Sequence, residues 1–248
     1  MPGSTPSSRA PAELSPGYAA NMQGVAAVDR ALSILVAIEA AETGSLSLAE
    51  LAAATLLYKS TLLRLLVSLE RGALVVRRAD QRYSLGPFAF RLGKSFESHN
   101  PIEERLAPIM RALVEQGTES PSFHVRHDAT RRLCLVRLDS RHSTLDRVRA
   151  GDLLPIDRGA AGRILLAYGE HGAATSPEVP RTMVSQGERD PLCGAVAAPV
   201  FGARGELIGA LSLSGPLDRF SPESIARMSE LLLAAASQAS QALGVHKP

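Results

Sequence analysis

The stretch from Leu46 to Tyr83 constrains the fold of this chain more than any other. Ser47 precedes a short apolar pattern and Glu50 follows three residues later, which is the spacing of a capping box at a helix N-terminus. After a break at 56–57, a second helix is predicted over residues 58–71, because its apolar residues recur at i, i+3, i+4 and i+7. This buried stripe consists of Leu62, Leu65, Leu66 and Leu69.

Two short strands are predicted after this helix, which ends at Gly72. They cover Leu74–Arg77 and Gln81–Leu85 and flank a polar tip at residues 78–80. Two helices joined by a tight turn and followed by a small hairpin form the outline of a winged helix-turn-helix. Such a fold presents one helix to the major groove of DNA, where short polar and basic side chains reach the base edges.

The charge of this region favours DNA binding over the alternative, a leucine-rich helical hairpin with a solvated basic face. Between Leu56 and Lys94 the chain has eight Lys or Arg residues but only two acidic residues, Glu70 and Asp80. Such cations neutralise phosphates and release counterions. Residues 1–95 hold 10 Lys/Arg against 7 Asp/Glu, and the remainder holds 17 against 18, so the basic excess lies in the N-terminal part.

Three segments, LSLAELAAAT, KSTLLRLLVSLERGALV and RYSLGPFAFRLG, resemble the DNA-binding domain of the IclR-type bacterial transcription regulators. In that family a Ser-Thr pair opens the recognition helix, an Arg follows one turn later, and Tyr-x-Leu-Gly closes the wing. The matching residues here are Ser60, Thr61, Arg64, Tyr83, Leu85 and Gly86. Two positions depart from the pattern: Leu56 replaces the usual Gly of the turn, and Tyr58 stands where Pro often starts the helix. A Leu at positive φ is strained by about 1–2 kcal/mol.

The expected DNA contacts lie on the recognition helix and the wing. Arg64 is expected to bind guanine through two hydrogen bonds, and Leu63 to touch a thymine methyl group. The wing arginines are expected to bind phosphates. The full predicted set is Tyr58, Lys59, Ser60, Thr61, Leu63, Arg64, Arg77, Arg78 and Arg82.

A chain of 248 residues favours two modest domains over one large one. Residues 1–23, rich in Pro, Ser, Gly and Ala, predict a disordered tail. Residues 24–86 form the winged domain, which begins with a helix at Val28–Glu39, and residues 87–99 form a linker helix. The second domain covers residues 100–248. The apolar stripe expected on the first helix is Val28, Leu32, Leu35 and Val36.

The second domain is predicted to be an antiparallel sheet flanked by helices, so the fold class of the chain is α+β. Its hairpin is supported by two apolar runs around a Gly-bounded turn. The expected helices are Ile102–Gln116, Gly159–Tyr168 and Pro222–Leu243. The expected strands are Ser122–Arg126, Leu133–Asp139, Ala197–Phe201, Glu206–Ser214 and, as a third strand of the first group, Ser143–Arg149.

Two further segments, RAGDLLPIDRGAAGRILLAYG and GAVAAPVFGARGELIGALSLSGP, together with the final helix, resemble the GAF-like effector-binding domain of the same family. Both resemblances together cover nearly all of residues 24–244. The segment 169–186 is shorter than the family usually has, and Arg163 stands where Lys is common. We expect Arg163 to be a surface cation.

The resemblance implies that backbone amides of the turn at 159–162 and two serine hydroxyls hold a small effector. Apolar residues of the sheet are expected to line the rest of the pocket. The alternative is that the small residues only permit tight helix–sheet packing and that the apolar ones are plain core. The expected set is Ala160, Ala161, Gly162, Ser212 and Ser214, with Phe123, Val125, Leu135 and Leu154 as the apolar lining.

The sequence offers little for an enzyme. It has neither a Gly-x-Ser-x-Gly elbow nor a phosphate-binding Gly-x-x-x-x-Gly-Lys loop, so no catalytic residue and no cofactor are expected. Cys134 and Cys193 are expected as inert buried thiols, in a reducing cytoplasm. His124 and His127 are predicted to face different sides, so no metal site is expected. No apolar run is long enough to span a membrane.

These observations predict a ligand-responsive transcription regulator, with repression favoured over activation. It is expected to bind an operator in double-stranded DNA as a homodimer or a dimer of dimers. Its effector is expected to be a small organic acid or aromatic compound. Two other classes stay open: a sensory or scaffold protein of the same fold without sequence-specific DNA binding, and a hydrolase with an unrecognised site.

Overall fold

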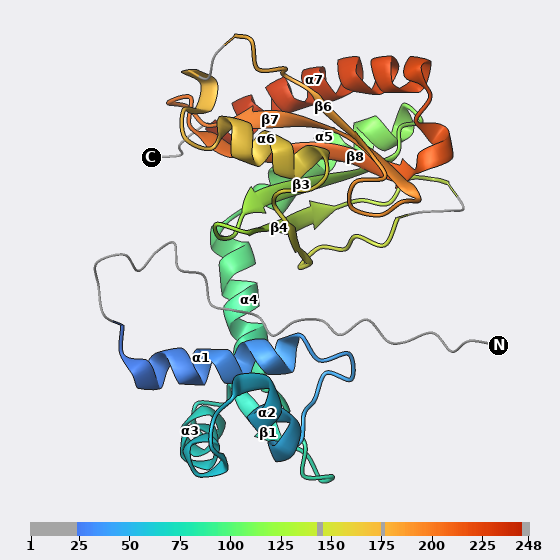
Figure 1. Cartoon of the computed structure of the whole chain (residues 1–248). Coiled ribbons are helices and arrows are strands. Elements are labelled where there is room, and N and C mark those ends of the chain that lie inside the picture. The colour runs from blue at the N-terminus through green and yellow to red at the C-terminus, as the bar shows by residue number, and fades with distance from the viewer. Residues whose placement is uncertain (1–23, 143–145, 175–176, 245–248) are drawn as a thin grey trace, which may run out of the picture. The chain divides into compact units, whose positions relative to one another are not determined.

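A computed structural model describes residues 24–142, 146–174 and 177–244 of the chain. The tail predicted over residues 1–23 therefore lies outside the described residues. The chain divides into two compact units, residues 1–99 and 100–248 (Figure 1). Each unit has a hydrophobic core of its own.

Three helices build the core of the first unit: α1 (Ala26–Glu39), α2 (Leu48–Thr55) and α3 (Lys59–Arg71). The predicted leucine stripe of α3 is confirmed, since three of its residues are buried and the fourth packs against the same core. The capping box of α2 is confirmed as well. The Ser47 N–H donates to Glu50 Oε2 at 2.6 Å, and the Glu50 N–H donates to Ser47 Oγ at 3.3 Å.

The apolar stripe predicted for α1 was wrong in part, since Leu35 packs against the core but Val28 and Leu32 do not. Its buried residues are Ile34 and Ile38, whereas Val28 and Leu32 are 53% and 45% exposed. Both pairs have i, i+4 spacing, so periodicity alone does not decide which face of the helix is buried. The face that packs inward also carries the small Ala31, which allows α1 to approach its neighbours closely.

The turn between α2 and α3 has the positive φ angle that is usual for a glycine, although a leucine occupies the position. Leu56 adopts the left-handed conformation, with φ 57° and ψ 21°, at the C-cap of α2. Its side chain is 86% exposed and therefore contributes almost no packing. The fold tolerates a strained Leu here because the turn itself, rather than this side chain, positions α3.

The wing is a two-stranded hairpin of β1 (Val75–Arg77) and β2 (Tyr83–Leu85), slightly shorter than predicted. Leu46 extends it, because its N–H donates to the Tyr83 carbonyl oxygen at 2.9 Å and its own carbonyl accepts from the Tyr83 N–H at 2.7 Å. The glycine that closes the wing is required sterically. A Cβ at Gly86 would lie 2.3 Å from the Ala73 carbonyl oxygen.

The last element of the first unit is α4 (Pro87–His99), which has no buried residue. Phe90, Leu92 and Phe96 are exposed along it. Exposed large apolar side chains gathered on one helix are typical of surfaces that bind another protein.

The second unit is built on a six-stranded antiparallel sheet with the strand order β5-β4-β3-β8-β7-β6. Helices α5 (Ile102–Glu115) and α7 (Pro222–Gly244) pack on one face, and α6 (Ala160–Tyr168) packs on the other (Figure 1). This confirms the α+β class. The strands are β3 (Ser120–Arg126), β4 (Arg131–Arg137), β5 (Leu153–Pro155), β6 (Met183–Gln186), β7 (Cys193–Phe201) and β8 (Leu207–Pro216), and two short 3-10 helices are η2 (Gly172–Ala174) and η3 (Leu217–Arg219).

Two predictions about strands were wrong. Residues 146–149 form no strand, and residues 143–145 of that prediction lie outside the described residues. Asp146 is buried in an ion pair instead, and the Arg149 N–H donates to Asp152 Oδ2 at 2.7 Å in a turn. Strand β6 was not predicted, because a four-residue edge strand within a loop-like segment has too few residues to show alternation.

Among the described residues, no single helix is both long and apolar enough to cross a membrane. Helices α2 and α3 meet that criterion only when taken together, across a bend of 107°.

We predict that Leu56→Gly stabilises the first unit by about 1 kcal/mol, because glycine adopts positive φ without the Cβ clash and little packing is lost. Urea unfolding of the full chain measures this change. Ala53→Gly, at an exposed helical position of α2, is the matched control and should cost about 1 kcal/mol. Equal destabilisation by both substitutions would contradict the strain at Leu56.

Candidate DNA interface and effector pocket

The face of α3 opposite the buried leucines is open to solvent. Lys59, Ser60, Leu63 and Arg64 are exposed on it, and Thr61 is half-buried. Tyr58, the N-cap residue, has an extended backbone with no side-chain cap and is 85% exposed. The structure thus brings the six predicted helix contacts together at the N-terminal end of α3, where a groove-binding helix places its base contacts.

The predicted contact set leaves out one exposed apolar residue of α3. Val67 lies one helical turn after Leu63, and the two are 54% and 46% exposed. Because residues four apart share a helix face, they form a continuous apolar strip beside Arg64.

The three wing arginines do not behave alike. Arg77 and Arg78 are exposed, and the Arg77 guanidinium lies 5.7 Å from the centre of the Tyr83 ring. Arg82 turns inward instead: its Nη2 lies 2.9 Å from the Ser45 carbonyl oxygen and 3.0 Å from Glu50 Oε2. The structure therefore gives Arg82 internal partners, whereas Arg77 and Arg78 remain exposed on the wing.

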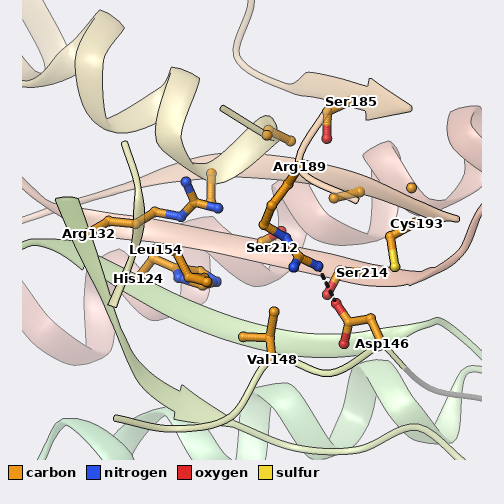
Figure 2. Close-up of a pocket in the computed structure, with 15 residues that line it drawn as sticks. His124, Arg132, Asp146, Val148, Leu154, Ser185, Arg189, Cys193, Ser212 and Ser214 are labelled. Carbon is orange, nitrogen blue, oxygen red and sulfur yellow. Dashed lines mark hydrogen bonds and ion pairs between the residues drawn. The ribbon is translucent and has the colours of Figure 1, made fainter. Parts of the chain in front are cut away.

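The second unit contains a cavity of about 30 Å³ at the start of α6, bordered by the sheet (Figure 2). A buried water needs roughly 10–15 Å³ of such space, so the cavity is large enough for a small polar group. Of the predicted effector residues, five line the cavity: Leu154, Ala160, Ala161, Ser212 and Ser214. Ser212 and Ser214 are two apart on β8, so their hydroxyls share the cavity face of the sheet.

The other predicted residues do not reach the cavity. Phe123 and Leu135 pack into the core beneath α5 and α7, on the opposite face of the sheet, and Val125 joins them there. Side chains alternate along a strand, so Phe123 must point away when its neighbour His124 points in. Gly162 serves close packing, since a Cβ there would lie 2.2 Å from the Ile156 carbonyl oxygen.

Most of the polar side chains around the cavity were missed by the sequence analysis. They come from β3, β4, β6 and two loops, so no local motif unites them. Alternation along β3 could have indicated His124, two residues after Ser122, but the residues on the other strands and in the loops carry no such signal. The missed residues are His124, Arg132, Asp146, Ser185 and Arg189.

Arg132 is buried on β4, with 3% of its surface exposed. Its Nη1 donates to the carbonyl oxygens of Pro155 and Arg158, the latter at 2.7 Å. Burial, and then the positive charge of Arg189, lower the pKa of Arg132 to about 10. The guanidinium therefore remains charged at neutral pH.

Asp146 provides negative charge at the other end of the cavity. Its carboxylate is fully buried and forms ion pairs with Arg137 Nη2 and, at 3.5 Å, with Arg189 Nη2 (Figure 2). Arg137 also lies 3.1 Å from Asp139 and donates to Ser214 Oγ at 3.3 Å. This network fixes one of the two serine hydroxyls predicted to bind the effector.

His124 is a buried, neutral imidazole in a positively charged environment. Its Nε2 lies 2.9 Å from Ser122 Oγ. Burial, together with the nearby charges of Arg132, Arg137 and Arg189, keeps the pKa of His124 well below 6.5. A neutral ring has one donor and one acceptor nitrogen, so it can bind either kind of polar group.

The amide at the start of α6 is already occupied. The Gly159 N–H donates to Glu188 Oε2 at 3.1 Å, and Arg163 lies 3.2 Å from the other Glu188 oxygen. A carboxylate is favoured at a helix N-terminus by the exposed amides and the helix dipole. The side chain of Glu188 therefore takes the place that the resemblance assigned in part to an effector.

The cysteines carry no sign of catalysis. Burial raises the pKa of the Cys134 thiol to about 12 and also raises that of Cys193. Both are protonated at neutral pH, and a thiol reacts as a nucleophile only when ionised. Within the described parts of the chain, no group of three or more His, Cys, Asp or Glu side chains could hold a metal ion.

The structure combines a winged helix-turn-helix, a form typical of DNA-binding domains, with an antiparallel sheet that borders a small polar cavity. The comparisons with known families agree. The IclR helix-turn-helix domain matches residues 27–79, and the C-terminal domain of the bacterial transcriptional regulator IclR matches residues 182–241. Both parts of the chain are thus similar to the IclR transcriptional regulators, and the matched families are regulators rather than enzymes.

Similar proteins span nearly the whole chain. The HTH-type transcriptional regulator BhcR of Paracoccus denitrificans is 28% identical, covering 90% of this chain and 89% of that protein. The transcriptional repressor IclR of Escherichia coli is 24% identical, covering 89% and 90%. The crystal structure of an IclR homologue from Microbacterium hydrocarbonoxydans, complexed with 4-hydroxybenzoate, has a TM-score of 0.69 at 19% identity, covers 88% and 98%, and so shows the same fold.

We predict that His124 makes the stability of the second unit depend on pH. The unfolded chain takes up a proton at His124 below about pH 6.5, whereas the folded chain does not. Unfolding is therefore favoured as the pH falls, by up to about 1.4 kcal/mol per pH unit. Urea unfolding between pH 7.5 and 5.5 should show the advantage of the wild type over His124→Gln shrinking. Parallel stability curves for the two proteins would contradict a neutral buried His124.

Proposed function

We propose that this chain is a sequence-specific, operator-binding regulator whose affinity for DNA is modulated by a small acid bound in the second unit. The observation that carries the proposal is the exposed N-terminal face of α3, with Lys59, Ser60 and Arg64 opposite a buried leucine stripe. Its basic wing supplies phosphate contacts at Arg77 and Arg78. A solvated basic helix without a DNA role would need neither this wing nor the tight turn before α3.

Base recognition is assigned to three side chains of α3. Arg64 presents a guanidinium suited to the two acceptors of guanine, and the apolar strip of Leu63 and Val67 suits thymine methyl groups. Tyr58 and Lys59 lie at the start of the helix, where they suit contacts to the backbone of DNA. The half-site is therefore expected to combine a guanine with neighbouring thymines.

Pairing of two chains is supported by exposed apolar residues on two helices of the first unit. Val28 and Leu32 on α1, with Phe90 and Leu92 on α4, are all at least 45% exposed. Covering such surfaces in a homodimer removes them from water. Two paired recognition helices would then bind half-sites about one helical turn apart in a pseudo-palindromic operator. Dimers of this kind could pair again into tetramers.

Repression is supported by two relatives, one named a transcriptional repressor and the other an acetate operon repressor. An acidic effector is supported by the excess of arginines around the cavity and by the homologue that was crystallised with 4-hydroxybenzoate. For the acid to regulate, it must bind better to one arrangement of the paired DNA-binding units than to the other.

The proposal is tested by titrating the protein onto DNA from upstream of its own gene, at two salt concentrations and against scrambled competitor. Tight, salt-dependent binding that survives the competitor is expected. Binding abolished by the competitor would instead favour a sensory or scaffold protein of this fold, with a basic surface but no operator.

We predict that Arg64→Ala weakens operator binding by about 1–3 kcal/mol and relaxes the base preference at one position of each half-site. Binding to a library of operators with single base changes measures both effects. Arg71→Ala, at an exposed cation in the last turn of α3, is the control and should leave the base preference unchanged. An equal loss on every sequence would make Arg64 a phosphate contact.

We predict that Ser212→Ala combined with Ser214→Ala leaves operator affinity intact and blunts the response to the effector, because both hydroxyls line the cavity. Release of operator DNA by a panel of small organic acids measures the response. A double variant that is released as readily as the wild type would place the effector elsewhere.

A further inference from the structure

One buried cation of the second unit lacks an acidic partner. Within the described parts of the chain, no carboxylate oxygen lies within 4.0 Å of the Arg132 guanidinium nitrogens, and Arg132 Nε has no hydrogen-bond partner. Its contacts through Nη1 are to neutral backbone carbonyls. A buried charge is costly unless it is paired. This side chain therefore has unused capacity for an anion, and it lines the cavity.

The other arginines around the cavity are already paired. Arg137 and Arg189 share the Asp146 carboxylate, and Arg137 also pairs with Asp139. Arg163 pairs with Glu188. Arg132 differs from them: the Asp157 charge is close enough to raise its pKa, but no carboxylate of the described residues lies within 4.0 Å of its guanidinium, so a ligand with one negative charge can pair with it there.

The turn at the start of α6 does not supply an equally open site. Its first amide, at Gly159, is bound by the Glu188 carboxylate. A ligand carboxylate at this amide would have to displace Glu188 and break its pair with Arg163. At Arg132 a ligand carboxylate displaces no acidic group of the described residues.

The remaining lining of the cavity suits a short acid with a second polar group. Ser212 and Ser214 present hydroxyls, and Nδ1 of the buried His124 has no hydrogen-bond partner among the described residues. The cavity of about 30 Å³ admits only one small group as it stands. A larger ligand body must move a half-buried neighbour, such as Leu154 or Arg189.

We propose that Arg132 determines the specificity of this pocket and binds the carboxylate of a short monocarboxylic acid. The inference rests on the proposed function, because it assigns ligand chemistry to the pocket through which the regulator would respond. The guanidinium is preorganised for the task by its two backbone carbonyl partners, and two parallel N–H donors match the two oxygens of a carboxylate.

Acetate and acetamide isolate the carboxylate contribution, because they have nearly the same shape and differ in charge. Calorimetric titration of the full-length protein, with acetate replacing chloride at constant ionic strength, is expected to show saturable binding of acetate. Acetamide is expected to bind at least about tenfold more weakly, since it lacks the charge-assisted hydrogen bonds.

Arg132→Gln removes the charge and is expected to weaken acetate binding at least about tenfold. The matched control is Arg131→Gln, which changes the preceding residue of β4, where the side chain pairs with Asp128 at 2.8 Å. This control should bind acetate like the wild type. If Arg132→Gln fails to fold, Arg132→Lys decides: it keeps the charge but lacks the planar pair of donors, and it should weaken acetate binding several-fold.

Equal acetate affinity in the wild type and the folded Arg132 variant overturns the proposal. The proposal is also overturned if the wild type shows no saturable acetate binding. It is likewise overturned if Arg189→Gln weakens acetate binding and Arg132→Gln does not. Operator binding by the same preparations separates the two hypotheses. Acetate binding through Arg132 without operator recognition contradicts the proposed function alone, whereas operator recognition without acetate binding contradicts the Arg132 anchor alone.

Discussion

The antiparallel ladder of β3, β8 and β7 is the constraint on which the second unit depends. Because successive side chains of a strand point to opposite sides, each residue faces either the core or the cavity side of the sheet. Phe123, Leu211 and Leu213 lie in the core beneath α5 and α7, whereas Ser212 and Ser214 line the cavity. A shift of register by one residue would bury the serines in an apolar core and fill the cavity with leucines. Stability and the pocket are therefore specified by the same hydrogen-bond register.

The sequence was most informative where the signal is local. The capping box at Ser47 and Glu50 and the leucine stripe of α3 depend on residues within two helical turns, and the structure confirms both. The α+β class followed from the same kind of pattern. The face of α1 was misjudged because two faces of that helix carry apolar residues at the same spacing, and only tertiary packing selects between them.

The pocket was predicted less well, for a physical reason. Ser212 and Ser214 were found because they lie two apart on one strand. Arg132, Asp146 and Arg189 meet only after β4 and two loops are folded, and ion pairs between distant segments leave no periodic trace in a sequence. Phe123 was predicted to line the cavity but lies in the core, whereas the next residue of β3, His124, lines the cavity.

The inward turn of Arg82 couples the length of the wing to the start of α2. One guanidinium joins Ser45, the capping residue Glu50 and the hairpin, and the Arg78 N–H closes the tip by donating to the Arg82 carbonyl oxygen at 2.8 Å. An insertion between Arg78 and Arg82 would move that guanidinium out of reach of both partners. A change in the length of the wing would therefore also require different contacts at the N-terminus of α2.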